Sequence, residues 1–98
     1  MNIILKNSKL KEKKFMVIFE NPKQTIHFGS AGMSDYTKHK DKRRKQLYII
    51  RHRKRENWTK SGIRTAGFWA RWVLWNKPSL EQSIKNIEKR FNVNIKGF

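Results

Sequence analysis

The sequence has no cysteine and few acidic residues, and both shortages exclude classes of protein. Without thiols the chain can build neither a disulfide scaffold nor a thiolate zinc site. Only 7 Asp and Glu stand against 24 Lys and Arg, which leaves a net charge of +17. So strong a positive balance favours polyanions as partners. With 98 residues and no linker-like or repeated segment, the chain is expected to form one small domain.

Long hydrophobic runs are also missing. The N-terminal segment MNIILKNSKL holds only Ile3, Ile4 and Leu5 in a row before its lysines, far short of a signal-peptide core. Nowhere do about 18 apolar residues follow one another, as a membrane-spanning helix requires. We therefore expect a soluble protein that is not secreted and has no membrane partner.

Residues 38–60, KHKDKRRKQLYIIRHRKRENWTK, form a strongly basic segment. It contains eleven Lys and Arg but only two acidic residues, Asp41 and Glu56, which gives a local charge of +9 in under a quarter of the chain. Such a run is often only a solvated face, and it can also bind anionic membranes or act as a nuclear-import signal. Because Glu is nearly absent here and the apolar turn LYII at 47–50 interrupts the charges, we expect a folded phosphate-binding element rather than a disordered arm.

The residues before this segment predict a β-hairpin. Residues 15–19, FMVIF, and residues 24–28, QTIHF, are typical of strands, and Pro22 lies in the turn between them. Residues 3–5 could supply a third strand, and Val93 and Ile95 a short terminal one. The polar character of the first residues suggests a lead-in at 1–13 and a domain at 14–98.

Ser34 or Asp35 can cap a long basic helix that runs to about Glu56. In that helix Leu47 and Ile50 would face inward. The sequence thus predicts an α+β fold, a small single domain in which an N-terminal β-hairpin is followed by this long basic helix and two shorter packed helices.

The two shorter helices are expected near the end of the chain. Residues 68–75, FWARWVLW, are so apolar that their helix must be central to the core. Ser79 and Gln82 form a capping box before an amphipathic helix at 79–91. Periodicity over the whole chain selects the residues expected to be buried: Phe15, Val17, Phe28, Leu47, Ile50, Phe68, Trp72, Leu80, Ile84, Ile87 and Phe91.

Histidines and carboxylates are the only material for a metal or hydrolytic site. His39 with Asp41 is a fragment found in nucleases, and His52 with Glu56 would lie one turn apart on a helix. No HExxH motif, paired-carboxylate signature or P-loop accompanies them. Simpler roles account for these residues: His39 and His52 add to the cationic face, Asp35 caps a helix, and Glu56 pairs with an arginine. We predict no enzyme, no catalytic residue, no metal, no cofactor and no small-molecule substrate.

Arginine forks can chelate phosphate oxygens, whereas lysines act as point charges. Tryptophans could also stack on unpaired bases, but the spacing of residues 69, 72 and 75 more often indicates a core. Trp58 lies beside the basic segment and is the better candidate for a ring that faces a ligand. The expected nucleic-acid-binding residues are Lys40, Arg43, Arg44, Arg51, Arg53, Lys54, Arg55, Trp58 and Lys60.

Three motifs carry a resemblance to a known family: HFGSAGMSDYTKHKD at 27–41, YxxRHxxRExW at 48–58 and SGIRTAGFWARWVLWNKPSLEQSI at 61–84. Over about residues 14–92 the chain resembles a family of small basic proteins of unknown function encoded by large nucleocytoplasmic DNA viruses. The resemblance implies a viral protein, in the virion and in the infected host cell, either in the cytoplasmic viral factory or in the nucleus. It transfers no activity to any position.

Two functional classes follow from these observations. The first is a nucleic-acid-binding protein, with DNA favoured over RNA, that contacts phosphates regardless of sequence and is associated with the genome in the virion. The alternative is a structural or inner-capsid adaptor protein that docks on acidic surfaces of other virion proteins. An enzyme acting on nucleic acid comes third.

Overall fold

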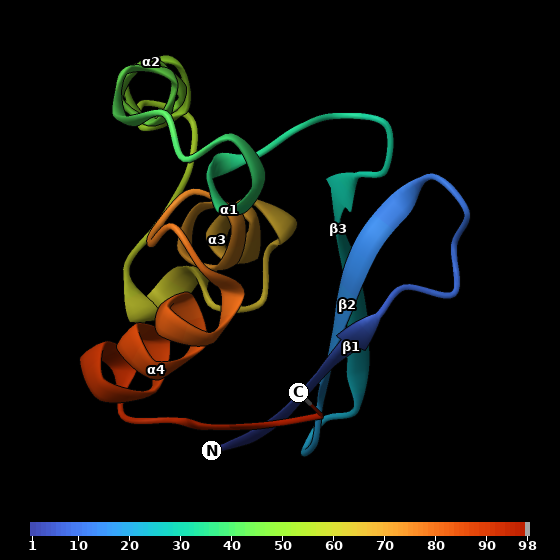
Figure 1. Cartoon of the computed structure of the whole chain (residues 1–98). Helices are drawn as coiled ribbons and strands as arrows, with labels where there is room; N and C mark the ends of the chain where they lie inside the picture. The colour runs from blue at the N-terminus through green and yellow to red at the C-terminus, as the bar shows by residue number, and fades with distance from the viewer. Residues whose placement is uncertain (98) are drawn as a thin grey trace.

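Four strands and several short helices follow one another along residues 1–97, the part of the chain that this computed structural model describes (Figure 1). The elements in chain order are β1 (Asn2–Asn7), β2 (Lys13–Phe19), β3 (Gln24–Ser30), α1 (Tyr36–His39), α2 (Lys42–His52), the 3₁₀-helix η1 (Lys60–Gly62), α3 (Ala66–Trp69), the π-helix η2 (Ala70–Leu74), α4 (Leu80–Phe91) and β4 (Asn94–Lys96). The mixed α and β content confirms the predicted fold class.

The predicted hairpin is present as β2 and β3, which are antiparallel and pair Phe15 with Phe28 and Val17 with Ile26. The sheet order is β3-β2-β1-β4. β1 lies inside the sheet, antiparallel to β2 and parallel to β4, so the third strand and the terminal strand expected from the sequence are both present. The segment 1–13, set apart above as a lead-in, therefore contributes an inner strand to the domain.

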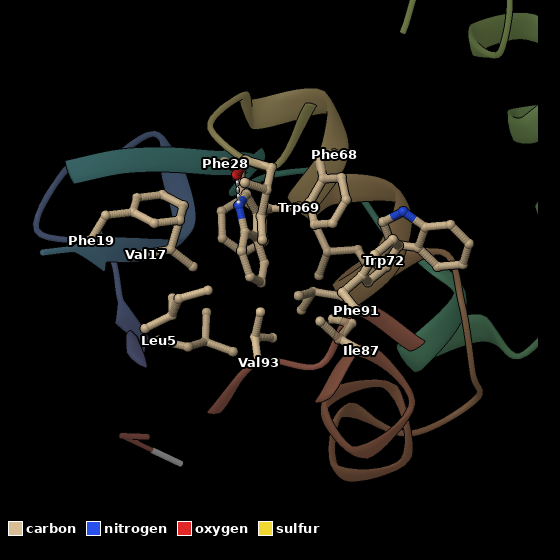
Figure 2. Packing of buried hydrophobic residues seen from close by; sticks show 14 residues of the cluster. Leu5, Val17, Phe19, Phe28, Phe68, Trp69, Trp72, Ile87, Phe91 and Val93 are labelled. Atoms are coloured by element: carbon tan, nitrogen blue, oxygen red, sulfur yellow. Dashed lines mark hydrogen bonds between the residues drawn. The ribbon is translucent and has the colours of Figure 1, made fainter. Parts of the chain in front are cut away.

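Aromatic rings from the helices fill the core against one face of the sheet (Figure 2). Trp69 lies fully buried between Phe28 and Phe68, and its indole Nε1 donates a 2.6 Å hydrogen bond to the carbonyl oxygen of Ile63. This bond satisfies a polar group that would otherwise be costly to bury. Leu5 and Val17 approach the same cluster from the sheet.

The two C-terminal helices agree with their predictions. The apolar segment forms α3 and continues as η2, in which the amide of Trp75 donates to the carbonyl of Ala70. The hydroxyl of Ser79 accepts from the amide of Gln82 at 3.1 Å and caps α4. Of the residues expected to be buried, six are buried and three are half-buried against the core: Val17, Phe28, Phe68, Trp72, Ile87 and Phe91 in the first group, and Phe15, Leu80 and Ile84 in the second.

The prediction that Leu47 and Ile50 are core residues is wrong, because they are 50% and 52% exposed. α2 turns another face toward the body of the protein, and Tyr48 is half-buried at its centre. The ring of Tyr48 is parallel to that of Trp75, with centroids 4.5 Å apart. A flat aromatic contact of this kind removes more apolar area from water than either aliphatic side chain would, and it sets the rotation of the helix.

The long basic helix predicted from residue 35 to about Glu56 is also wrong in its extent. Asp35 does cap a helix, but α1 ends after one turn at Lys40, whose φ of 55° is left-handed. The carboxylate of Asp41 then accepts from the amides of Arg43 and Arg44 and starts α2 as a new helix. α2 ends at His52, so the residues that follow form a turn.

In the view of Figure 1, α2 lies above α1, which it contacts. No helix within residues 1–97 is both long enough and apolar enough to span a bilayer.

Two isoleucines of α4 test the description of the core. Ile87 is fully buried, whereas Ile84 is half-buried. We expect Ile87→Ala to lower the free energy of unfolding by about 2–5 kcal/mol and Ile84→Ala by about 1–2 kcal/mol, because a cavity costs most where no solvent can enter. Urea denaturation measures both values. Equal losses would contradict this placement of α4 on the sheet.

Candidate functional site

The exposed Lys and Arg of residues 38–60 form one positively charged region, called here the basic surface. Within residues 1–97 the side-chain ion pairs are Lys14 with Asp35 and Lys85 with Glu81, and neither involves this region. Asp41 is occupied by the capping of α2. The positive charge of the basic surface is therefore not neutralised by the protein itself.

The predicted binding residues come from four pieces of backbone. Arg43, Arg44 and Arg51 project from α2, and Lys40 lies in the link before it. The turn after α2 carries Arg53, Lys54 and Arg55, and η1 carries Lys60; all eight side chains are exposed.

Trp58, the ninth predicted residue, is half-buried and packs against the core. Its ring lies 6.3 Å from that of Tyr48, and its carbonyl oxygen accepts a 3.0 Å hydrogen bond from Nε1 of Trp72. The guanidinium of Arg71 lies 5.4 Å from the centroid of the same ring. These contacts assign Trp58 to the packing beneath α2.

An aromatic stack attaches α2 to the body of the protein. The ring of Tyr48 lies 4.4 Å from that of His52 and 4.5 Å from that of Trp75, with interplanar angles of 28° and 4°. Burial, followed by the nearby carboxylate of Glu56, raises the pKa of Tyr48 to about 12. The phenol is therefore neutral at physiological pH, as its position between rings requires.

Two half-buried cations reinforce this attachment. Lys45 of α2 donates from Nζ to the carbonyl of Asn76 at 2.6 Å and lies 5.0 Å from the ring centroid of Tyr36. Arg71 lies 4.3 Å from the ring centroid of Trp72 and donates to the carbonyl of Trp75 at 2.6 Å. Burial lowers the pKa of both groups. Neighbouring positive charges lower the pKa of Lys45 further, whereas for Arg71 the interaction with Tyr48 partly offsets the effects of burial and of Arg90. Lys45 thus holds α2 directly, whereas Arg71 contacts the tryptophans beneath it.

A cleft of about 480 Å³ opens between α2 and the end of the β2–β3 hairpin. In Figure 1 the loop that leaves β3 leads to α1, and α2 follows α1 in the chain. One wall consists of Arg44, Leu47, Tyr48, Arg51 and His52, which follow one another at helical spacing along α2. The exposure of Leu47 has its explanation here, because this side chain lines the cleft.

The opposite wall belongs to the hairpin and to η2. Lys13 and Met33 line it from the hairpin side, and Leu74 and Trp75 line it from the helical side. Gly29 brings the two together: its φ is +80°, and a Cβ at this position would lie 2.7 Å from Cδ1 of Leu74. Only glycine permits this conformation and this approach without strain.

Asp35 ties the loop between β3 and α1 to the sheet. The carboxylate is 1% exposed, pairs with the ammonium of Lys14 and accepts from the amide of Thr37 at 2.9 Å. Burial alone would raise the pKa of Asp35, but the hydrogen bonds from Lys14 and Thr37 and the charge of Lys14 together lower it below the ordinary 3.8. Lys14 and Asp35 thus neutralise each other, and the remaining charge of the cleft is positive.

The histidine and carboxylate pairs have local structural contacts. Nδ1 of His39 accepts a 3.0 Å hydrogen bond from the amide of Asp41. Because α2 ends at His52, Glu56 does not lie one turn further along it, and its carboxylate lies against Gly67 instead. The expected ion pair between Glu56 and an arginine is absent from the described part of the chain. No group of three His, Asp or Glu residues there is close enough to hold a metal ion.

The cleft is not among the features predicted from the sequence. The spacing of Arg44, Leu47 and Arg51 contains a signal, because these residues share one face of a helix. Lys13 and Trp75 carry no such signal, since only the tertiary fold brings them opposite α2.

The sequence profile of a family of unknown function, DUF5754, matches residues 3–52, just over half of the 98 residues. The chain belongs to that family. The match includes the first three strands, α1 and α2, with both arginines of the cleft, and ends before Trp75. No curated protein and no solved structure matches the chain. The viral origin implied by the sequence motifs remains a prediction.

Replacing Tyr48 tests the attachment of α2. Tyr48→Ala removes the stack on Trp75, so we expect the amides of α2 to exchange with solvent at least about tenfold faster, while those of β2 and α4 change little. Tyr48→Phe keeps the stack and should preserve protection. Hydrogen exchange read by mass spectrometry separates these segments. Unchanged protection of α2 in Tyr48→Ala would show that the helix is held by other contacts.

Asp35 gives a prediction of pH dependence. Because its folded pKa is lowered, its contribution to stability is fully present above the unfolded pKa near 3.8 and is lost as the pH falls through the folded pKa. Asp35→Asn leaves the ammonium of Lys14 buried without its partner, and we expect a loss of about 3 kcal/mol at pH 7. The difference between the two proteins should shrink below pH 4 in denaturation curves. A difference independent of pH would contradict the ion pair.

Proposed function

We propose that this member of the DUF5754 family binds nucleic acid, with DNA as the favoured polymer, through the basic surface. One observation carries the proposal: ten cations of the single segment 38–60 are exposed, and within residues 1–97 none of them has a carboxylate partner. A surface that is merely solvated normally mixes both signs of charge. Phosphate groups are the neutralising partner that a polymer supplies at close and repeated spacing.

The rigidity of the region supports this function. α2 is capped by Asp41 and attached by Tyr48 and Lys45, so its arginines are held on a folded element before any ligand arrives. Less conformational entropy is then lost on binding than for a disordered basic arm. The side chains spread over α2, the following turn and η1, which suits contacts along a backbone more than recognition of one base pair. We therefore propose binding that depends little on sequence.

The proposal treats the protein as a binding protein rather than an enzyme, without a cofactor or a small-molecule substrate. The hydrogen bond that the amide of Asp41 donates to Nδ1 of His39 and the capping role of Asp41 favour this interpretation.

On the basis of the resemblance to viral proteins, we also propose that this protein is associated with the genome in the virion and acts in the infected cell. The alternative, a virion adaptor that docks on an acidic protein surface, draws support from the exposed apolar side chains of Leu47 and Ile50 among the cations. Salt dependence distinguishes the two functions, because the release of counterions from DNA makes log K fall linearly with log salt.

Replacing Arg44, Arg51 and Arg55 by Ala in one protein tests the basic surface. We expect weaker binding to oligonucleotides of every sequence and a salt slope smaller by about 0.7–0.9 for each lost contact, since each arginine no longer neutralises a phosphate. Fluorescence anisotropy over a series of salt concentrations gives both quantities.

A second triple variant, with Lys23, Lys89 and Lys96 replaced by Ala, is the matched control. It removes the same charge from exposed positions on the hairpin turn, α4 and β4. Its slope should stay close to that of the unmodified protein. If the arginine variant is folded and binds DNA with unchanged affinity and slope, the basic surface is not the nucleic-acid site and docking on an acidic protein becomes the better account.

A further inference from the structure

The cleft between α2 and the hairpin combines cationic and apolar side chains. Arg44 and Arg51 are exposed residues of its α2 wall, and they lie seven residues apart, about 10 Å along the helix. Leu47 lies between them on the same wall. An apolar patch flanked by two arginines therefore faces the cavity.

The opposite side of the cleft repeats this combination. Lys13 contributes a third cation, whereas Met33 and Leu74 contribute apolar atoms. The other lysine of the lining, Lys14, is neutralised by Asp35. Apart from that pair, the charged side chains in the lining are all positive. These cations line the cavity together with the apolar side chains.

A nucleotide has the matching chemistry, because it joins a flat and weakly polar base to an anionic phosphate. We propose that the cleft receives an unpaired base of a single strand, while Arg44, Arg51 and Lys13 contact the phosphates on either side of it. This inference rests on the proposed function and adds the form of the nucleic acid that is preferred. The volume of about 480 Å³ lies within the range of small-ligand pockets and suffices for a base with its sugar.

A duplex cannot use this cavity in the same way. Its bases are stacked on one another and offer only their edges in the grooves, whereas a base of a single strand can be turned out against apolar and aromatic side chains. Duplex DNA can still contact the exposed charges of the basic surface. We therefore expect single strands to bind more tightly than duplexes of equal length, because the base held in the cleft contributes additional binding free energy.

The decisive comparison uses two oligonucleotides with identical backbones. One is an oligothymidylate, and in the other the bases are absent while the sugars and phosphates remain. We expect the oligothymidylate to bind about 5- to 150-fold more tightly, the range typical of one base held by stacking. Equal binding of both would overturn the base site and leave phosphate binding intact. The absence of binding to both of these strands and to a duplex of equal length would overturn the proposed function itself.

Two aliphatic residues of α2 give a matched pair of variants. Leu47 and Ile50 are isomeric and almost equally exposed, but only Leu47 lines the cleft. Leu47→Ala should reduce the preference for the strand with bases about three- to tenfold, because apolar contact with the base is lost, and should leave the salt slope unchanged. Ile50→Ala should keep the full preference. The same loss in both variants would contradict the assignment to the cleft.

Photo-crosslinking locates the base directly. An oligothymidylate with one 5-iodouracil, which reacts on irradiation with aromatic and sulfur-containing side chains next to it, should attach to peptides that contain Met33, Tyr48 or Trp75. Attachment only to other peptides would overturn the proposal. Thymidine monophosphate is the second probe: if it binds as tightly as the strand, the cleft is a site for a free nucleotide, and the commitment to a single strand is wrong.

Discussion

The packing of α2 against the body of the protein depends on the stacked rings of Tyr48 and Trp75. Net repulsion among the cations opposes any compact arrangement of this chain, and α2 carries the densest group of them. A ring contact is insensitive to that repulsion, because its stabilisation comes from apolar area and dispersion. The stack therefore fixes a highly charged helix to the core without the ion pairs that would consume its charge.

This arrangement divides the protein into two parts with different chemistry. The sheet, α3, η2 and α4 enclose the aromatic core, whose packing around Trp69 is independent of the basic surface. α2 and the turn after it present cations and a few apolar side chains to the outside. The cleft lies where the parts meet, so it draws apolar atoms from the body and positive charge from the helix. A site that binds both base and phosphate follows from this position rather than from any single motif.

Local signals made most of the fold predictable. The hairpin around Pro22, the capping box at Ser79 and the cap at Asp35 each depend on residues a few positions apart. The orientation of α2 was not predictable in this way. Hydrophobicity alone favoured Leu47 and Ile50 as its inner face, whereas the observed face is chosen by aromatic partners much later in the chain. The end of the first helix at Lys40 also escaped prediction, because a left-handed lysine has no reliable signature in one sequence.

The candidate site likewise has features that the sequence predicts and features that depend on the tertiary fold. Its charge was evident from composition, and eight of the nine expected binding residues are on the surface. The role of Trp58 in packing and the presence of Lys13 opposite α2 both depend on tertiary contacts. Sequence analysis could therefore indicate the class of ligand but not the shape of the cavity.

The parallel pairing of β1 with β4 has a consequence for how the protein is made. The side chains of Asn2 and Asn94 share a hydrogen bond across 92 positions of sequence, so β1 gains its second neighbour only after the whole segment from β2 to α4 has been synthesised. Until then a nascent polypeptide with most of its lysines and arginines would be exposed without a finished core.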